Sequence, residues 1–254
     1  YIPADVDVAG GAQALADELI DRIERLAGAH PDKFALATCA ADILRARDTG
    51  RIALPMGMEN GGPIAGDLGR LDHYRDRGIV YVGLTHSRAN HIADSSYDLN
   101  ERWGGLSPFG RELIAALNDR GMLIDVSHIS DKAFWQVIEL SATPVIASHS
   151  SLRHFTPGFH RNMDDAMVEA IGRNGGVVQI NFGSGFLTRS AREYSDAQQA
   201  AFLRFRAQSG LEPDHPELST FGVRYREQNP YPFATVDDVL DHIDRAVELA
   251  GIDH

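Results

Sequence analysis

Cysteine is nearly absent from this sequence, since Cys39 is the only one among 254 residues. A single cysteine excludes an internal disulfide framework, and it excludes a zinc site built from several thiolates. Any bound metal must therefore rely on histidine and carboxylate ligands. One cysteine does not fix the compartment in which a protein works, so the localisation stays open.

Long apolar runs and an excess of positive charge are also lacking. No run approaches the roughly 18 apolar residues of a membrane span. The opening residues YIPADVDVAG have no basic stretch followed by an apolar one, as a signal peptide would, and they look like the interior of a protein. The formal net charge of -12 argues against a nucleic-acid or anionic-membrane partner, because both favour basic surfaces. We therefore expect no nucleic-acid partner and no membrane segment.

The sequence is otherwise that of an ordinary globular protein. It is 43% hydrophobic and 24% charged, which predicts one domain with a large core over residues 1–254. Five apolar runs, each entered from a polar or turn-like segment, predict strands. They lie within residues 51–61, 78–87, 121–130, 143–151 and 175–185.

Helical patterns alternate with these runs. Residues 11–30 carry Leu15, Leu19, Ile23 and Leu26 at helical spacing, which predicts an amphipathic helix. Further helices are predicted within residues 66–78, 107–121, 130–143 and 236–251. Strands that alternate with helices indicate a parallel α/β architecture.

Two of these helices carry recognisable end signals. Ser107 can cap its helix, Pro108 suits the first helical position, and Gly121 suits a left-handed stop. In the next helix, Ser130 or Asp131 is available as the cap. That helix is expected to place Ala133, Val137 and Leu140 on one face.

Two strand-like runs end on the same pair of residues, Ser127-His128 and Ser148-His149. The carboxyl ends of parallel strands converge at one mouth, where barrel and open-sheet enzymes place their active sites. The two imidazoles should therefore point at a common centre. A single histidine of this kind is more often a satisfied polar residue at a strand end, but the repeated placement favours function.

Four successive predicted strands deliver a residue that can bind metal: Glu59, His86, His128 and His149. Glu59, His128 and His149 supply one oxygen and two nitrogens, which is typical of a catalytic zinc site with open positions. A carboxylate can also bridge two metals. The alternatives are a helix cap or ion pair for Glu59 and a histidine at the edge of the core for His86.

Residues 184–235 interrupt the alternation of strands and helices. So long a connection is unusual unless it forms helices of its own or covers a site. Because it follows the carboxyl end of a strand, it is expected on the active-site side of the domain. A variable surface excursion is the alternative.

Several strings follow one another along nearly the whole chain: YIP, GMENG, YVGLTHSRAN, LSPFG before LIDVSHIS, PVIASHSS, RNMDD, NFGSGFL and DHIDRAVELAGIDH. Taken in this order, they make the sequence resemble the renal (membrane) dipeptidase family of the amidohydrolase superfamily. The resemblance implies a metal-dependent hydrolase with a (β/α)8 TIM barrel and two zinc ions.

The resemblance also implies roles for individual residues. Glu59 becomes the carboxylate that bridges the two zinc ions, and His128 and His149 bind one of them. His86 polarises the scissile carbonyl or steadies the tetrahedral intermediate. Arg161, in RNMDD, grips the terminal carboxylate of the substrate.

Arg161 also has a physical argument of its own. A planar guanidinium can hold a carboxylate through two parallel hydrogen bonds. The alternative is a surface ion pair with Asp164 or Asp165.

The sequence departs from the family pattern at both ends. The family carries a His-x-Asp pair on its first barrel strand, which binds the other zinc, and an aspartate in a DFDG-like string on its last strand. The acidic string ADVDV near the start has no histidine, and no DFDG-like string occurs in the sequence. We therefore expect an interior portion of a longer enzyme, with the first and last barrel strands missing and little or no activity by itself.

The function predicted for the parent protein is that of a zinc-dependent dipeptidase, with a dipeptide as its substrate. The oligomeric state stays open, with a homodimer as one alternative. A related amidohydrolase that acts on a lactone or phosphoester is one alternative, since it would not need Arg161 to hold a carboxylate. A non-catalytic barrel that keeps a binding pocket is the other. The preferred dipeptide, its stereochemistry and any action on β-lactam-type amides stay open.

Overall fold

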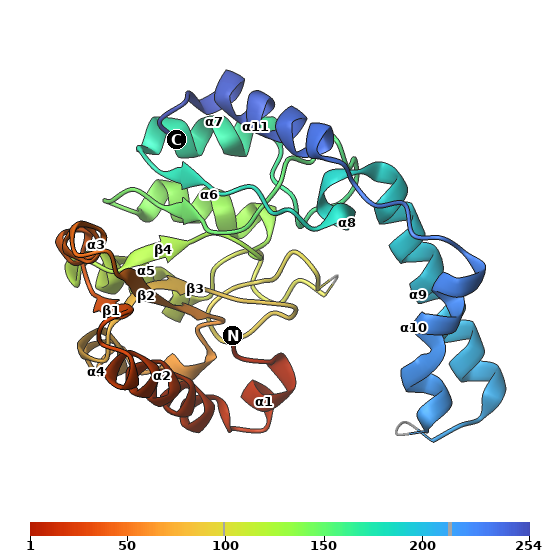
Figure 1. Cartoon of the computed structure of the whole chain (residues 1–254), viewed down its shortest axis with the longest axis horizontal. Coiled ribbons are helices and arrows are strands. Elements are labelled where there is room, and N and C mark those ends of the chain that lie inside the picture. The colour runs from red at the N-terminus through yellow and green to blue at the C-terminus, as the bar shows by residue number, and fades with distance from the viewer. Residues whose placement is uncertain (99, 213–214) are drawn as a thin grey trace.

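The computed structural model describes residues 1–98, 100–212 and 215–254 (Figure 1). Its centre is one sheet of six parallel strands, and their order in space follows their order in the chain. The strands are β1 (Phe34–Ala37), β2 (Ile52–Glu59), β3 (Ile79–Gly83), β4 (Leu123–Asp125), β5 (Ile146–Ala147) and β6 (Val177–Val178). The sheet curls into a half-barrel, as an incomplete TIM barrel would, and this confirms the parallel α/β prediction.

Helices lie along the outer side of the curved sheet in Figure 1. Those between and after the strands are α2 (Ala12–Ala29), α3 (Ala40–Asp48), α4 (Arg70–Asp76), α5 (Pro108–Asp119), α6 (Asp131–Leu140), α7 (Asp165–Asn174) and α11 (Val236–Ala250). Two short elements, α1 (Ala4–Val8) and η1 (Gly62–Ile64), complete the first half of the chain. The core lies between sheet and helices, where Val82, Ile124, Leu113 and Leu117 are fully buried.

The prediction of five strands was wrong by one, because β1 was not recognised. This strand is the tetrapeptide FALA, in which two alanines carry little β-propensity and Leu36 is 39% exposed. It pairs with the first half of β2, from Phe34 opposite Ile52 to Ala37 opposite Pro55. Helices α3 and α7 were not predicted either. In α3 the larger apolar side chains face solvent, so its apolar pattern does not mark a buried face.

The predicted helix ends are largely confirmed. Ser107 Oγ accepts a hydrogen bond from the Gly110 amide at 2.9 Å, Pro108 is the first residue of α5, and Gly121 has a φ of 65°. Of the two candidate caps for α6, Ser130 is the one used, and it accepts from the Ala133 amide at 3.3 Å.

Two expected apolar faces are narrower than predicted. In α6, Ala133 and Val137 are buried, but Leu140 is 39% exposed. In α2, Leu15, Leu19 and Ile23 pack against the core, whereas Leu26 is 39% exposed. Both exceptions lie near the carboxyl ends of their helices.

One glycine controls the packing inside the sheet. A Cβ atom at Gly57 of β2 would lie 1.9 Å from Cζ of Tyr81 on β3, so only glycine leaves room for that ring. The register between β2 and β3 shifts at the same place, between Met56 and Gly57. The glycine therefore lets the Tyr81 ring lie across β2 just before the strand reaches Glu59.

The described part of residues 184–235 is mostly helical: α8 (Ser184–Leu187), α9 (Arg189–Ser209) and α10 (Pro216–Gln228). Helices α9 and α10 pack against each other through aromatic contacts such as Phe202 with Phe221, whose ring centroids are 5.5 Å apart. Figure 1 shows this pair as an arm that projects away from the sheet, whereas α8 stays beside it. Among the described residues, no helix combines the length and apolarity needed to cross a bilayer.

Candidate metal centre and active site

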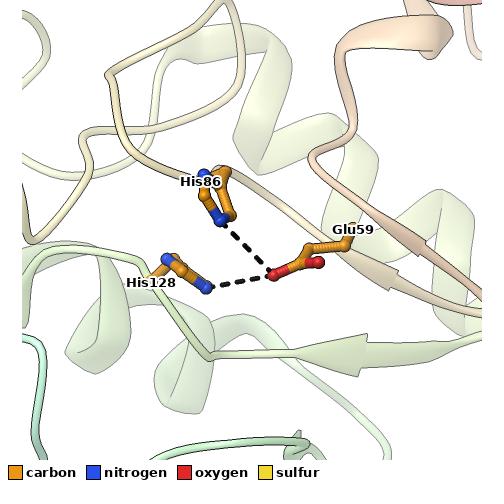
Figure 2. A group of neighbouring side chains, drawn as sticks. All are labelled: Glu59, His86 and His128. Atoms are coloured by element: carbon orange, nitrogen blue, oxygen red, sulfur yellow. Dashed lines mark ion pairs between the residues drawn. The ribbon is translucent and has the colours of Figure 1, made fainter. Parts of the chain in front are cut away.

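Four side chains converge beyond the carboxyl edge of the sheet, around one carboxylate oxygen. Glu59 Oε1 lies 3.1 Å from Nε2 of His128, 3.1 Å from Nε2 of His149 and 3.6 Å from Nε2 of His86. Glu59 ends β2, and the three histidines follow β3, β4 and β5. Figure 2 shows two of these imidazoles, His86 and His128, directed at Glu59. The strand ends thus bring together the four residues that the sequence singled out.

Two overlapping groups of three can be drawn from these residues. The ligand atoms of Glu59, His86 and His128 all lie within 4.8 Å of one another. Glu59, His128 and His149 form a tighter group, because the two Nε2 atoms are also only 2.8 Å apart. Atoms that bind one zinc ion at 2.0 to 2.2 Å are separated by about 3.3 to 3.6 Å at tetrahedral angles, so the tighter group has nearly the right size.

The donor chemistry also fits a divalent metal. Two imidazole nitrogens and one carboxylate oxygen, each able to bind a metal through a lone pair, face one another at 2.8 to 3.1 Å. Neutral imidazoles have only one proton each to share among these contacts. A cation between the three atoms would remove their mutual repulsion, and one carboxylate with two imidazoles is a common ligand set of catalytic zinc.

Burial and mutual contacts together hold His86, His128 and Glu59 in the protonation states that bind metal. It lowers the pKa of His128 to about 3, although the hydrogen bond with Glu59 opposes the shift. It also lowers the pKa of His86, against the attraction of Glu59. For Glu59, burial raises the pKa, but the hydrogen bond from His128 and the contact with His149 outweigh it and hold the pKa well below its ordinary value. His86 and His128 are thus neutral and Glu59 ionised near neutral pH.

The serines of the two Ser-His pairs brace the neighbouring strand ends. Ser148 Oγ donates to Asp125 Oδ2 at 2.5 Å, and Asp125 Oδ1 accepts from the amides of Ser127 and Ser148. In the opposite direction, Ser127 Oγ accepts from the His149 amide at 3.1 Å. Each serine is therefore bonded to the other strand, Ser127 to His149 itself and Ser148 to Asp125, three residues before His128.

This network also sets the tautomer of His149. Ser148 Oγ lies 2.7 Å from His149 Nδ1, and its only proton is directed at Asp125. Nδ1 of His149 must then be the donor, so its Nε2 carries the lone pair that points towards Glu59. Contacts of this kind behind a ligand orient it and raise its basicity. The sequence signals for Asp125 and Ser148 were present in DVSH and ASHS, but their roles were not predicted.

Strained backbone conformations occur at the carboxyl edge of the sheet, next to the proposed ligands. Two of the three non-glycine residues with positive φ among the described residues are His128, at 73°, and Asn60, at 72°. The carbonyl of His128 is held by the Ser96 amide at 2.7 Å. The side chain of Asn60, directly after Glu59, donates to the Ile2 carbonyl at 3.0 Å. Conformations of this kind persist only where the surroundings enforce them, and they are frequent at functional sites.

Arg161 lies beside the cluster and is 3% exposed. Its guanidinium donates to Ser150 Oγ at 2.9 Å and to the His149 carbonyl at 2.8 Å, and no carboxylate among the described residues pairs with it. The alternative of an ion pair with Asp164 or Asp165 is wrong, since Asp164 caps α7 and Asp165 pairs with Arg245.

Burial lowers the pKa of Arg161, because a charge in this position is poorly solvated. A buried cation that lacks a charged partner is costly for the fold. Its cost is offset when an anion enters the space next to it. The position of Arg161 is therefore typical of a residue that recognises a negatively charged ligand.

One cavity of about 440 Å³ joins Arg161 to the four converging side chains. Its wall also includes Ser87, Tyr97 and Phe186. The two aromatic residues were not predicted from the sequence, because they lie on long connections whose path in space is not encoded by local periodicity. The sequence feature that came closest to indicating these residues was the unusual length of the segments that carry them.

These observations define a class of protein: a parallel half-barrel with a candidate metal site and an anion-recognising arginine in one cavity at its carboxyl edge. Comparison with known proteins identifies the family within this class. The profile of the family described as membrane dipeptidase (peptidase family M19) matches residues 2–254. The chain belongs to this family.

Individual relatives agree with the family assignment. An uncharacterised dipeptidase of Schizosaccharomyces pombe is 29% identical over 242 residues, which cover 93% of this chain and 48% of the relative. Dipeptidase 3 of Mus musculus is 31% identical over 191 residues, or 74% of this chain and 38% of the relative. The crystal structure of the probable dipeptidase PvdM from Pseudomonas aeruginosa superposes with a TM-score of 0.82 at 29% identity, over 100% of this chain and 68% of that one. The chain thus spans about half the length of the S. pombe relative, or less in the mouse protein.

Proposed function

We propose that this chain carries the active site of a zinc-dependent dipeptidase, which hydrolyses the peptide bond of a dipeptide with metal-activated water. The observation that carries the proposal is the shared cavity: Glu59, His128 and His149 converge within 3.1 Å a short way from the buried, uncompensated Arg161. A metal site would activate water for hydrolysis, and the arginine would bind the free carboxylate of a short peptide. In the intact enzyme we expect a closed (β/α)8 barrel of the metal-dependent hydrolase type.

His128 and His149 are the proposed nitrogen ligands of one zinc ion, and Glu59 is the proposed bridge to a second. When bound, zinc lowers the pKa of water towards about 7 and polarises a carbonyl group. The residues of this chain prepare the site for it. Burial keeps His128 neutral, and the Asp125–Ser148 network turns Nε2 of His149 towards Glu59.

His86 is the proposed catalytic residue that contacts the substrate. Its Nδ1 is buried and has no hydrogen-bond partner among the described residues, whereas its Nε2 faces the cavity beside Glu59. Because burial keeps the ring neutral, a proton on Nε2 is available to the scissile carbonyl oxygen and to the tetrahedral intermediate. No change in its net charge is needed for this role.

Arg161 is the proposed substrate-binding residue. A bidentate, charge-assisted pair with the terminal carboxylate would place the peptide bond at a fixed distance from the metal site. This contact supports a dipeptide over a lactone, which presents no anion to the buried cation. A phosphodiester carries its charge on the group that reacts at the metal, whereas the carboxylate of a dipeptide is separate from the scissile bond and is free to pair with Arg161.

The test uses the intact, zinc-loaded protein that contains this chain, with Gly-Phe, its C-terminal amide, a simple lactone and a phosphodiester as substrates. We expect hydrolysis of the free dipeptide, loss of activity after treatment with a chelator, and recovery on addition of zinc. Turnover of the lactone or phosphodiester alone would assign a related amidohydrolase. A protein that binds no zinc and hydrolyses none of the four would be a binding barrel without catalysis.

A further inference from the structure

Three aromatic rings in contact with one another form part of the cavity wall and its backing. Tyr97 and Phe186 line the cavity itself. Phe159 lies behind them and joins them, with ring centroids 6.1 Å from Tyr97 and 5.5 Å from Phe186, both in edge-to-face geometry. The three rings come from three separate connections, so their meeting is a feature of the folded protein. We call these residues the aromatic wall.

The aromatic wall is held in place by groups behind it. The guanidinium of Arg192, on α9, lies 4.7 Å from the centroid of Phe159 and also donates to Asp196 at 2.5 Å. Tyr97 is anchored through its backbone amide, which donates to Ser95 Oγ at 3.2 Å. Ser95 Oγ in turn donates to the His86 carbonyl at 2.5 Å, so the loop that carries Tyr97 is tied to the strand end that carries His86.

The aromatic wall is adjacent to the arginine that is proposed to hold the substrate. The centre of the Arg161 guanidinium lies 5.6 Å from the centroid of Phe186. In a dipeptide, the terminal carboxylate and the side chain of the second residue branch from the same Cα atom. When Arg161 holds that carboxylate, the side chain must therefore lie within a few ångströms of the guanidinium, where Phe186 and Tyr97 form the surface.

We propose that the aromatic wall is the binding surface for the side chain of the C-terminal residue, and that the preferred substrates are dipeptides with a large apolar or aromatic residue there. This rests on the proposed function, since it takes Arg161 as the carboxylate anchor. Flat rings bind such side chains by burying apolar area and by edge-to-face contacts. Phe159 and Arg192 act behind the contact surface as positioning residues.

An acidic C-terminal side chain is the main competing ligand, because Arg192 is a second cation near the aromatic wall. Its charge is already compensated, since its guanidinium is paired with Asp196. Its face is also occupied by the ring of Phe159. The surface offered to the ligand is therefore largely apolar, and an acidic side chain would lose its hydration there while the nearby Arg192 is already paired with Asp196.

The test compares kcat/KM for Gly-Phe, Gly-Ala and Gly-Glu with the intact, zinc-loaded protein that contains this chain and with two variants of the aromatic wall. Burial of a phenyl ring predicts that Gly-Phe exceeds Gly-Ala by about ten- to a hundredfold, with Gly-Glu the poorest of the three. Phe186→Ala should bring the ratio of Gly-Phe to Gly-Ala close to one. Phe186→Leu, which keeps most of the packing volume, should retain an intermediate ratio and guards against a loss that comes only from misfolding.

Phe182→Ala is the matched control. Phe182 stands four residues earlier, is 68% exposed and does not line the cavity, so its removal should leave the ratio unchanged. Equal kcat/KM for the three dipeptides, a preference for Gly-Glu, or a ratio that survives both Phe186 substitutions would overturn the proposal while leaving dipeptidase activity intact.

If no dipeptide is hydrolysed, the proposed function fails, and calorimetric binding of the same three peptides still decides the inference. Tighter binding of Gly-Phe that is lost in Phe186→Ala would support the aromatic wall as a binding surface. Equal affinities would reject it.

Discussion

The Nε2 atoms of His128 and His149 face each other at 2.8 Å, and both lie 3.1 Å from the same oxygen of Glu59. Neither imidazole can leave this arrangement easily, because His128 is buried and His149 is held through both its backbone amide and its Nδ1. Such preorganisation predicts tight metal binding, since little side-chain freedom is lost when the ion arrives.

Substitution of either histidine should remove zinc. We expect His128→Ala and His149→Ala to lose at least one zinc ion per chain together with dipeptidase activity, because each removes one of two nitrogen ligands. Elemental analysis of the purified variants measures the stoichiometry. His154→Ala is the control. His154 is an exposed histidine on the connection that follows His149, so this variant should retain zinc. Full zinc content in both ligand variants would exclude the proposed site.

Substitution of Ser148 should weaken zinc binding without abolishing it. Ser148→Ala removes the acceptor of the His149 Nδ1 proton and leaves Asp125 without its hydroxyl donor. Loss of such a contact behind a ligand typically costs ten- to a hundredfold in metal affinity. Competition with a chromophoric chelator measures the affinity, and Ser87→Ala, in the same cavity, should not change it. An affinity unchanged in Ser148→Ala would mean that the tautomer of His149 is fixed by other contacts.

Substitution of Arg161 should change which substrates are recognised. Arg161→Ala removes a charge-assisted contact worth about 1.5 to 3 kcal/mol, so kcat/KM for Gly-Phe should fall by about ten- to a hundredfold. The amide of Gly-Phe lacks the carboxylate, so its kcat/KM should change much less. Kinetics with both substrates measure the difference. If the unsubstituted enzyme hydrolyses the two equally well, Arg161 does not bind the carboxylate.

Two substitutions of Asn60 should distinguish the cost of its strained backbone from the contribution of its side-chain hydrogen bond to stability. Asn60→Gly and Asn60→Ala both lose the bond to the Ile2 carbonyl, but only alanine also meets the left-handed backbone, which costs about 1 to 2 kcal/mol. We therefore expect Asn60→Ala to be less stable than Asn60→Gly by that amount in urea unfolding. Equal stabilities would show that the backbone relaxes once the side chain is removed.

The pair of Asp131 and Arg153 should make stability depend on pH in the acid range. Burial raises the pKa of Asp131, but hydrogen bonds from Arg153 outweigh it, so the pKa lies below the ordinary value of 3.8. As the pH falls, Asp131 therefore takes up its proton in the unfolded state before it does so in the folded state. The pair's contribution to the free energy of unfolding is full above pH 3.8 and is lost as the pH falls through the folded-state pKa. Asp131→Asn should be less stable than the unsubstituted protein near neutral pH, and the difference should shrink at low pH. Asp48→Asn, on an exposed pair, should show little difference at any pH.

The extent to which the sequence predicted this site follows from how local its signals are. His128 and His149 were predictable because each directly follows an apolar run that forms a buried strand, and parallel strand ends meet. Strand β1 was missed because FALA is short and partly exposed, and its pairing with β2 depends on residues nearly twenty positions away. Tyr97, Phe159 and Phe186 were missed for a stronger reason: their three connections meet only after the sheet has curled, and no local pattern encodes that meeting.

The cross-bracing of the two Ser-His pairs has a consequence for how this site can change during evolution or in the laboratory. Ser127 supports the strand that carries His149, and Ser148 is held by Asp125 on the strand that carries His128. Substitutions at the two pairs should therefore be strongly non-additive, and a library that randomises one pair while the other is fixed would sample mostly inactive sequences. The aromatic wall comes from separate connections, so under the proposed function substrate preference can diversify there while the proposed metal ligands stay coupled to one another.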